Sequence, residues 1–81
     1  MLKITFYGEI GSRLGSERLM ELASPVTTVG DLRQALANDD EAAASLLRPT
    51  IRAAVDNCVV RDDAEVRDGQ EVCFFSIVSG G

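Results

Sequence analysis

The sequence predicts an α+β domain in which a mixed sheet of four to five strands packs on one main helix, with short helices beside it. Strand-like alternation opens and closes the 81-residue chain, and a segment with helical spacing lies between. The content of 46% hydrophobic and 26% charged residues is typical of soluble globular domains. A chain of this length has room for a single small core.

The opening third predicts a strand hairpin with a decorated connection. Apolar side chains occupy every second position over residues 2–8, which indicates a strand with one buried face. Residues 9–16 have helical spacing interrupted by glycines, so we expect a short helical turn there. Strand pattern resumes over residues 17–22.

The main helix is predicted from Thr28, which can cap it, to about Asn38. Asp31 lies three residues after the cap, where a carboxylate meets the positive end of the helix dipole. The stripe expected to face the core consists of Val29, Leu32 and Leu36, with Ala35 beside them.

The second half predicts a short helix closed by Pro49, followed by more strands. In order, these are a helix over 39–47, strands over 51–55 and 59–60, a charged segment over 61–68, and a last strand over 71–78. Both faces of the last strand are apolar, so we expect it in the centre, between the first and third strands. That arrangement is the β-grasp of ubiquitin-like proteins.

Composition excludes most side-chain catalysis. Histidine is absent, which removes Ser/His/Asp and Cys/His mechanisms and imidazole metal ligation. Cys58 and Cys73 do not have redox or zinc spacing, so reduced thiols are expected. Gly8, Gly11 and Gly15 do not match a phosphate loop, and the carboxylates lie in connections, where solvated charge is usual.

The net charge of −5 disfavours nucleic acid and anionic membranes as partners. A protein partner with a basic docking face would suit it, although an acidic balance is also an ordinary means of solubility. We expect no metal and no permanently bound cofactor. With no signal-peptide pattern and no span-length apolar run, a cytoplasmic location is expected.

Two features point to function. Tyr7, Val59 and Phe75 are predicted on the sheet face away from the helix, where they would form an apolar docking patch for a protein. The chain then ends in Val78, Ser79, Gly80 and Gly81, so we divide it into a domain over 1–75 and a flexible tail over 76–81. A terminal glycine has no Cβ, so its carboxylate can pass a narrow channel unhindered.

A family resemblance runs along essentially the whole chain. Its anchors are the segments 3–8, 13–15, 28–33, 54–57 and 68–72, and Phe74-Phe75 leading to the terminal Gly80-Gly81. In this order they resemble the MoaD/ThiS family of ubiquitin-like sulfur carriers, which includes the small subunit of molybdopterin synthase. Many small subunits have prolines before the terminal tetrapeptide, where this chain has Ser76-Ile77.

The resemblance implies a non-catalytic subunit whose Gly81 is the modified group. An E1-like activating enzyme would adenylate Gly81 with ATP, and a sulfur donor protein would supply the sulfur of a thiocarboxylate. Residues 78–81 would insert into the large synthase subunit, in a heterotetramer, and donate sulfur to cyclic pyranopterin monophosphate for the molybdenum cofactor. Tyr7, Val59 and Phe75 carry over as the docking face.

Alternatives remain open at this stage. Sulfur donation to thiamin or another thiolation pathway needs the same tail, as does conjugation to protein lysines. A plain ubiquitin-like docking module would use the apolar patch alone. A thiol relay would need Cys58 or Cys73.

Overall fold

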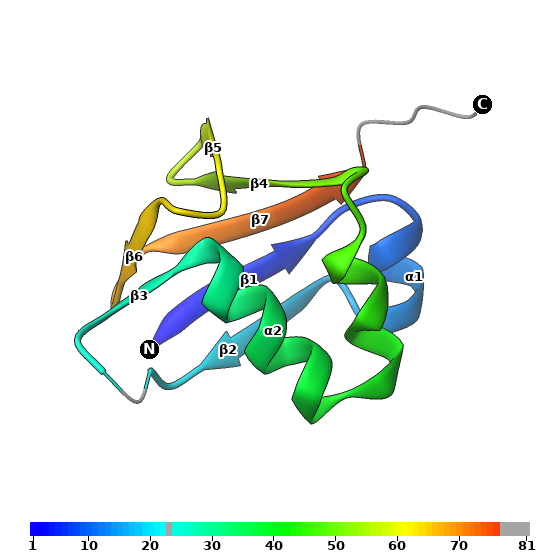
Figure 1. Ribbon diagram of the computed structural model, residues 1–81. Coiled ribbons are helices and arrows are strands. Elements are labelled where there is room, and N and C mark those ends of the chain that lie inside the picture. The colour runs from blue at the N-terminus through cyan, green and yellow to red at the C-terminus, as the bar shows by residue number, and fades with distance from the viewer. Residues whose placement is uncertain (23, 77–81) are drawn as a thin grey trace.

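The computed structural model describes the chain except for residues 23 and 77–81. Within the described residues, helices lie over one face of a mixed sheet (Figure 1). The elements in chain order are β1 Leu2–Phe6, α1 Glu9–Leu14, β2 Glu17–Met20, β3 Val26–Thr28, α2 Val29–Asp39, the 3₁₀ helix η1 Glu41–Leu47, β4 Ile51–Val55, β5 Cys58–Val60, β6 Glu65–Arg67 and β7 Glu71–Ser76.

The sheet has five strands in the order β2-β1-β7-β4-β5. β1 and β7 pair in parallel, with Phe6 opposite Phe74, and the other neighbours pair antiparallel. The last strand is therefore central, between the first and third predicted strands, which confirms that prediction and the β-grasp arrangement. Figure 1 shows β7 running through the middle of the sheet toward the end of the chain.

The core lies between the sheet and the helices. Phe6 and Phe74 stack across the parallel strands with ring centroids 6.1 Å apart. Leu32 and Leu36 of α2 and Leu46 of η1 are buried against the same side of the sheet. Burial of each such side chain contributes about 1.5–3 kcal/mol relative to exposure.

The loop between β5 and β6 caps the start of α2. The backbone N–H groups of Val29 and Gly30 donate to the carbonyls of Ala64 and Asp62, at 3.0 and 2.9 Å. Thr28 Oγ1 accepts from the Asp31 N–H at 3.1 Å, as the sequence predicted for the cap. These bonds satisfy three of the donors that a helix start leaves free. A Cβ at Gly30 would lie 3.3 Å from Asp62, so glycine lets the loop come close.

Arg33 is buried and ties the helical layer together. Its Nη1 donates to the Leu46 carbonyl at 2.6 Å, and its guanidinium carbon lies 5.4 Å from the centre of the Phe74 ring. Its Nε is 2.9 Å from Asp62 Oδ1, an ion pair in which the N–H is not aligned for a hydrogen bond. One side chain thus joins α2, η1, the β5–β6 loop and β7.

Three details differ from the sequence predictions. Arg33 is buried in α2, whereas Ala35, assigned to the core stripe, is exposed. Residues 41–47 form a 3₁₀ helix because the Asp40 carbonyl accepts from the N–H three residues on, at Ala43. The segment 61–68 contains β6, which pairs with β3 in a second small sheet. These two strands are too short to show alternation.

We expect Arg33→Ala to lower the free energy of unfolding by about 2–3 kcal/mol, measured by urea denaturation. The substitution leaves the Leu46 carbonyl without its donor and removes the packing on Phe74. The matched control is Arg67→Ala, whose ion pair with Glu65 is exposed, and whose effect should stay within about 0.5 kcal/mol. Equal effects of the two substitutions would contradict the role of Arg33.

Candidate functional site

The predicted tail leaves the fold from the central strand. Ser76, the last residue of β7, pairs with Ile51 at the start of β4. The tail-insertion residues Val78, Ser79 and Gly80, and the modified residue Gly81, lie outside the described part of the chain. What the structure does describe is the root of the tail: β1 and Tyr7 pair with β7 as far as Phe74, and β4 pairs with it up to Ser76.

The sheet face away from α2 carries no helix among the described residues, and we call it the open face. Alternation along β7 places Val72 and Phe74 in the core, and Cys73 and Phe75 half-buried on the open face. Tyr7, 60% exposed, continues the β1–β7 pairing, because its N–H donates to the Phe74 carbonyl at 3.0 Å. Tyr7 and Phe75 are therefore neighbours on the open face.

Val59 also lies on the open face, but it is not directly across the strands from Tyr7 and Phe75. It pairs with Ala54 of β4, and Ala54 pairs in turn with Cys73 of β7. Val59 is 67% exposed, whereas Ala54 is buried although it points to the open face. Ala54 and Cys73 thus join the predicted residues into one apolar strip, which runs diagonally from Tyr7 and Phe75 to Val59.

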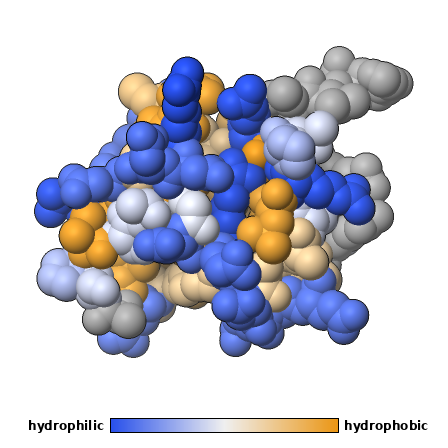
Figure 2. All heavy atoms as spheres, viewed as in Figure 1, coloured by the Kyte–Doolittle hydropathy of each residue, from blue (hydrophilic) through white to orange (hydrophobic). Residues whose placement is uncertain are grey.

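The sequence alone did not assign Ala54 and Cys73 to the apolar docking patch. Cross-strand register, which the sequence alone does not reveal, brings them into the strip. From the opposite, helix-bearing side, Figure 2 shows mostly hydrophilic side chains, with hydrophobic ones in separate groups. The structure therefore places Tyr7, Phe75 and Val59 on one face, and their role in docking remains a prediction.

Charged side chains border the strip at both ends. Arg52 is opposite Phe75 in the β4–β7 pairing, next to the root of the tail. At the other end, Glu71 follows the turn into β7, and Asp56 accepts hydrogen bonds from the Glu71 N–H and the Gln70 amide. At that other end Lys3 lies opposite Glu71 and pairs with Glu17, so the open face is basic near the tail and mixed, with more carboxylates than cations, away from it.

The two cysteines cannot act as a pair in this fold. Cys58 is opposite Val55, on the side of the sheet that faces the helices, whereas Cys73 is opposite Ala54 on the open face. Burial raises the pKa of the Cys73 thiol, Glu71 adds to the increase, and the neighbouring Thr5 hydroxyl opposes it. Their positions do not support a relay that passes from one cysteine to the other, and a relay through Cys58 or Cys73 alone stays a hypothesis.

The glycine-rich connection has a structural explanation. A Cβ at Gly11 would lie 2.8 Å from the Phe6 carbonyl oxygen, so only glycine fits there. Gly8 and Gly15, which flank α1, both have positive φ. No group of three or more potential metal ligands occurs among the described residues. The loop thus serves the fold, as the sequence favoured over a phosphate site.

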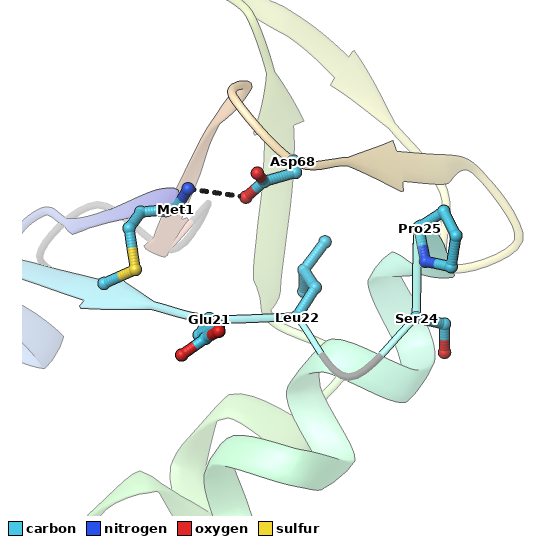
Figure 3. Close-up of a pocket in the computed structure, with 6 residues that line it drawn as sticks. All are labelled: Met1, Glu21, Leu22, Ser24, Pro25 and Asp68. Atoms are coloured by element: carbon cyan, nitrogen blue, oxygen red, sulfur yellow. Dashed lines mark ion pairs between the residues drawn. The ribbon is translucent and has the colours of Figure 1, made fainter.

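A surface hollow of about 430 Å³ lies at the far end of the molecule from the tail root. Figure 3 shows Leu22 pointing into it, with the Met1 amino group paired to Asp68 at 2.7 Å above. Lys3, near this end of β1, pairs with Glu71 at the start of β7, whereas the tail leaves at the other end of β7. The hollow is therefore separate from the candidate site.

The fold and the open face define a ubiquitin-like β-grasp protein with its C-terminal strand in the centre of the sheet. The ThiS family model matches residues 4–81, and the chain belongs to that family. It is 35% identical over 82 residues, and over the full length of both chains, to the "Molybdopterin synthase sulfur carrier subunit" of Escherichia coli.

Two solved structures have the same fold. The small archaeal modifier protein 1 of Haloferax volcanii superposes with a TM-score of 0.80 at 19% identity, over 95% of this chain and 97% of that one. A chain from the complex of subunits 1 and 2 of the molybdopterin-converting factor of Helicobacter pylori superposes with a TM-score of 0.68 at 16% identity, over 99% and 97%. Within the described residues, no helix has the length and apolar character needed to cross a bilayer.

We expect iodoacetamide to label Cys58 before Cys73 near neutral pH, as measured by mass spectrometry of peptides over time. Cys58 is exposed, whereas Cys73 is half-buried and its raised pKa reduces the thiolate fraction. In urea, where the burial is lost, the two rates should converge. Faster labelling of Cys73 in the folded protein would contradict the burial described for the open face.

Proposed function

We propose that this protein is a sulfur carrier and the small subunit of a molybdopterin synthase. In this proposal Gly81 is adenylated, converted to a thiocarboxylate, and used as the sulfur donor to cyclic pyranopterin monophosphate. The observation that carries the proposal is the full-length match to the Escherichia coli sulfur carrier subunit, at 35% identity, within the ThiS family. The terminal Gly80-Gly81 supplies the group that this chemistry needs.

The activation step follows from the low reactivity of a carboxylate. A carboxylate oxygen of Gly81 attacks the α-phosphorus of ATP, and pyrophosphate leaves. The acyl adenylate has AMP as a good leaving group, so a sulfur nucleophile from a donor protein can attack the carbonyl carbon. An E1-like enzyme catalyses the activation, and this chain contributes the substrate carboxylate and no catalytic side chain.

The fold supports this role through its central last strand. β7 is hydrogen-bonded to neighbours on both sides, so the residues after Ser76 start from a rigid base. The five residues 77–81 that follow Ser76 span about 15 Å or more when extended, long enough to reach a reaction centre inside another protein. We place this centre in the large subunit, within a cytoplasmic heterotetramer, and the Helicobacter pylori complex of subunits 1 and 2 offers a precedent for such pairing.

A second candidate is protein conjugation through the same carboxyl group. The observation that favours it is the fold shared with small archaeal modifier protein 1. Sulfur transfer to thiamin or another acceptor is a third use of the same thiocarboxylate. Products distinguish these: a dithiolene pterin with the large subunit, an isopeptide-linked protein, or a thiolated metabolite.

Incubation with the cognate activating enzyme, ATP and a sulfur source should raise the intact mass by about 16 Da, because sulfur replaces a carboxylate oxygen through an acyl intermediate. The gain should map to the C-terminal peptide and disappear when ATP is omitted. Absence of the gain, with an enzyme active on another carrier, would contradict the proposal.

Deletion of Gly81 is the matched control for that experiment. The variant should keep its fold, which is made by residues before the tail, and most of its affinity for the large subunit, which this proposal assigns mainly to the open face. It should show no mass gain and no sulfur transfer. A variant that retains full biological function would favour a docking module that does not use the carboxyl end.

Tyr7→Ala and Val59→Ala should each weaken binding to the cognate large subunit by about tenfold, measured by calorimetry. Both side chains are exposed on the open face, so their loss should leave thermal stability nearly unchanged. Leu47→Ala is the control, since Leu47 is 48% exposed but belongs to η1 on the helix side. If Leu47→Ala weakened binding as much, the docking face would have to be reassigned.

A further inference from the structure

One end of the open face, near the tail root, has a local charge opposite to that of the whole chain. The net charge is −5, yet the end of the face near the tail root carries Arg52, exposed beside Phe75. The β4–β5 pairing ends at Ala53 and Val60, and continuing its register by one step would bring Arg61, the exposed residue after β5, opposite Arg52. We therefore expect Arg52 and Arg61 near each other, at the corner of the open face close to the tail root.

Neither arginine has an ion-pair partner among the side chains that the structure describes. Arg48 likewise has none among the described side chains, whereas Lys3, Arg18, Arg33 and Arg67 each lie within 4.0 Å of a carboxylate. Like charges opposite each other on a sheet repel and destabilise the pairing. Arg52 and Arg61 thus have no described acidic neighbour, although the chain is rich in carboxylates. Neither residue belongs to the hydrophobic core.

The corner is too far from the reactive carboxyl group to act on it when the tail is extended. Five residues follow Ser76, and extended they place Gly81 about 15 Å or more beyond the end of β7. The nucleotide phosphates of the activation step would meet Gly81 at that distance. The surface that meets the corner is therefore the partner protein around the opening that receives the tail.

We propose that Arg52 and Arg61 bind carboxylate side chains of the partner protein beside that opening. The inference rests on the proposed function, because it takes the partner to be the large subunit. A guanidinium can hold a carboxylate through two parallel hydrogen bonds, and Arg next to an aromatic side chain is typical of the energetic centre of an interface. Phe75 is that aromatic neighbour.

The other end of the open face gives the interaction a direction. There the carboxylates of Glu71, Asp56 and Glu17 outnumber the one cation, Lys3, so the charge of the open face changes sign along β7. A partner with carboxylates near its channel and basic side chains farther away would match only one orientation, the one that aims the tail into the channel. The net charge predicted a partner with a basic docking face. In this proposal the partner needs basic side chains only where it meets the end of the open face away from the tail.

The test measures binding of the full-length chain to the cognate large subunit, with Arg52→Glu and the control Arg67→Glu. Arg67 lies on β6 in the second sheet, and its reversal changes the net charge by the same amount. Arg52→Glu should weaken binding about 10- to 100-fold at low salt, and the difference should shrink at high salt. Arg67→Glu should change affinity by less than about threefold.

Arg61→Glu provides an independent second variant and should act in the same direction. Arg52→Lys keeps the charge but not the paired donors, so it should lose part of the affinity. If the wild-type chain binds and Arg52→Glu and Arg61→Glu bind equally well, this proposal is overturned and the proposed function stands. If the wild-type chain does not bind the large subunit, the proposed function fails and this proposal fails with it. A third outcome is also possible: the wild-type chain forms a dimer, Arg52→Glu dissociates it, and binding of the large subunit does not change. That result would overturn the proposal and assign this surface to a second copy of the chain.

Discussion

The parallel pairing of β1 with β7 is the interaction on which the rest of the structure depends. It brings the first and last strands of the chain together in the middle of one sheet, with Phe6 and Phe74 stacked beneath. Parallel neighbours need a long connection, and here that connection contains α2, η1 and β4. Because β7 is central, the chain after Ser76 leaves from a strand that is held on both sides.

Arg33 couples that strand to the helical layer. Its guanidinium contacts the Phe74 ring on one side and the Leu46 carbonyl on the other, so α2, η1 and β7 share one buried charge. Phe75, which follows Phe74 in β7, points to the open face. Consecutive residues of one strand therefore serve different purposes: Phe74 stabilises the fold, and Phe75 belongs to the surface proposed to bind partners. A substitution at one position can change stability while the other surface stays intact.

The strands and the main helix were predictable because their signals are local. Alternation over 2–8 and 71–76, and the Thr28 cap, correspond to β1, β7 and the start of α2, and the last two residues of the predicted strand, 77 and 78, lie outside the described residues. Burial of Arg33 was not predictable, because it depends on Asp62 and Leu46, which are distant in sequence. The same holds for Ala54 and Cys73, which complete the apolar strip only through cross-strand register. Alternation assigned Tyr7, Val59 and Phe75 to one face of the sheet. It could not tell which of them lie opposite one another across neighbouring strands.

Net charge is a poor guide to the charge that a partner meets. The whole chain carries −5, and on that basis a basic partner surface was expected. The sheet register instead places Arg52 beside the tail root, whereas at the other end of β7 Glu71 lies opposite Lys3, among more carboxylates than cations. Since an exposed pair contributes little to folding, the described structure offers no stability reason for leaving Arg52 unpaired. A carrier that must deliver its end in one direction has a reason, because a polar face lets the partner distinguish the two orientations before the tail is engaged.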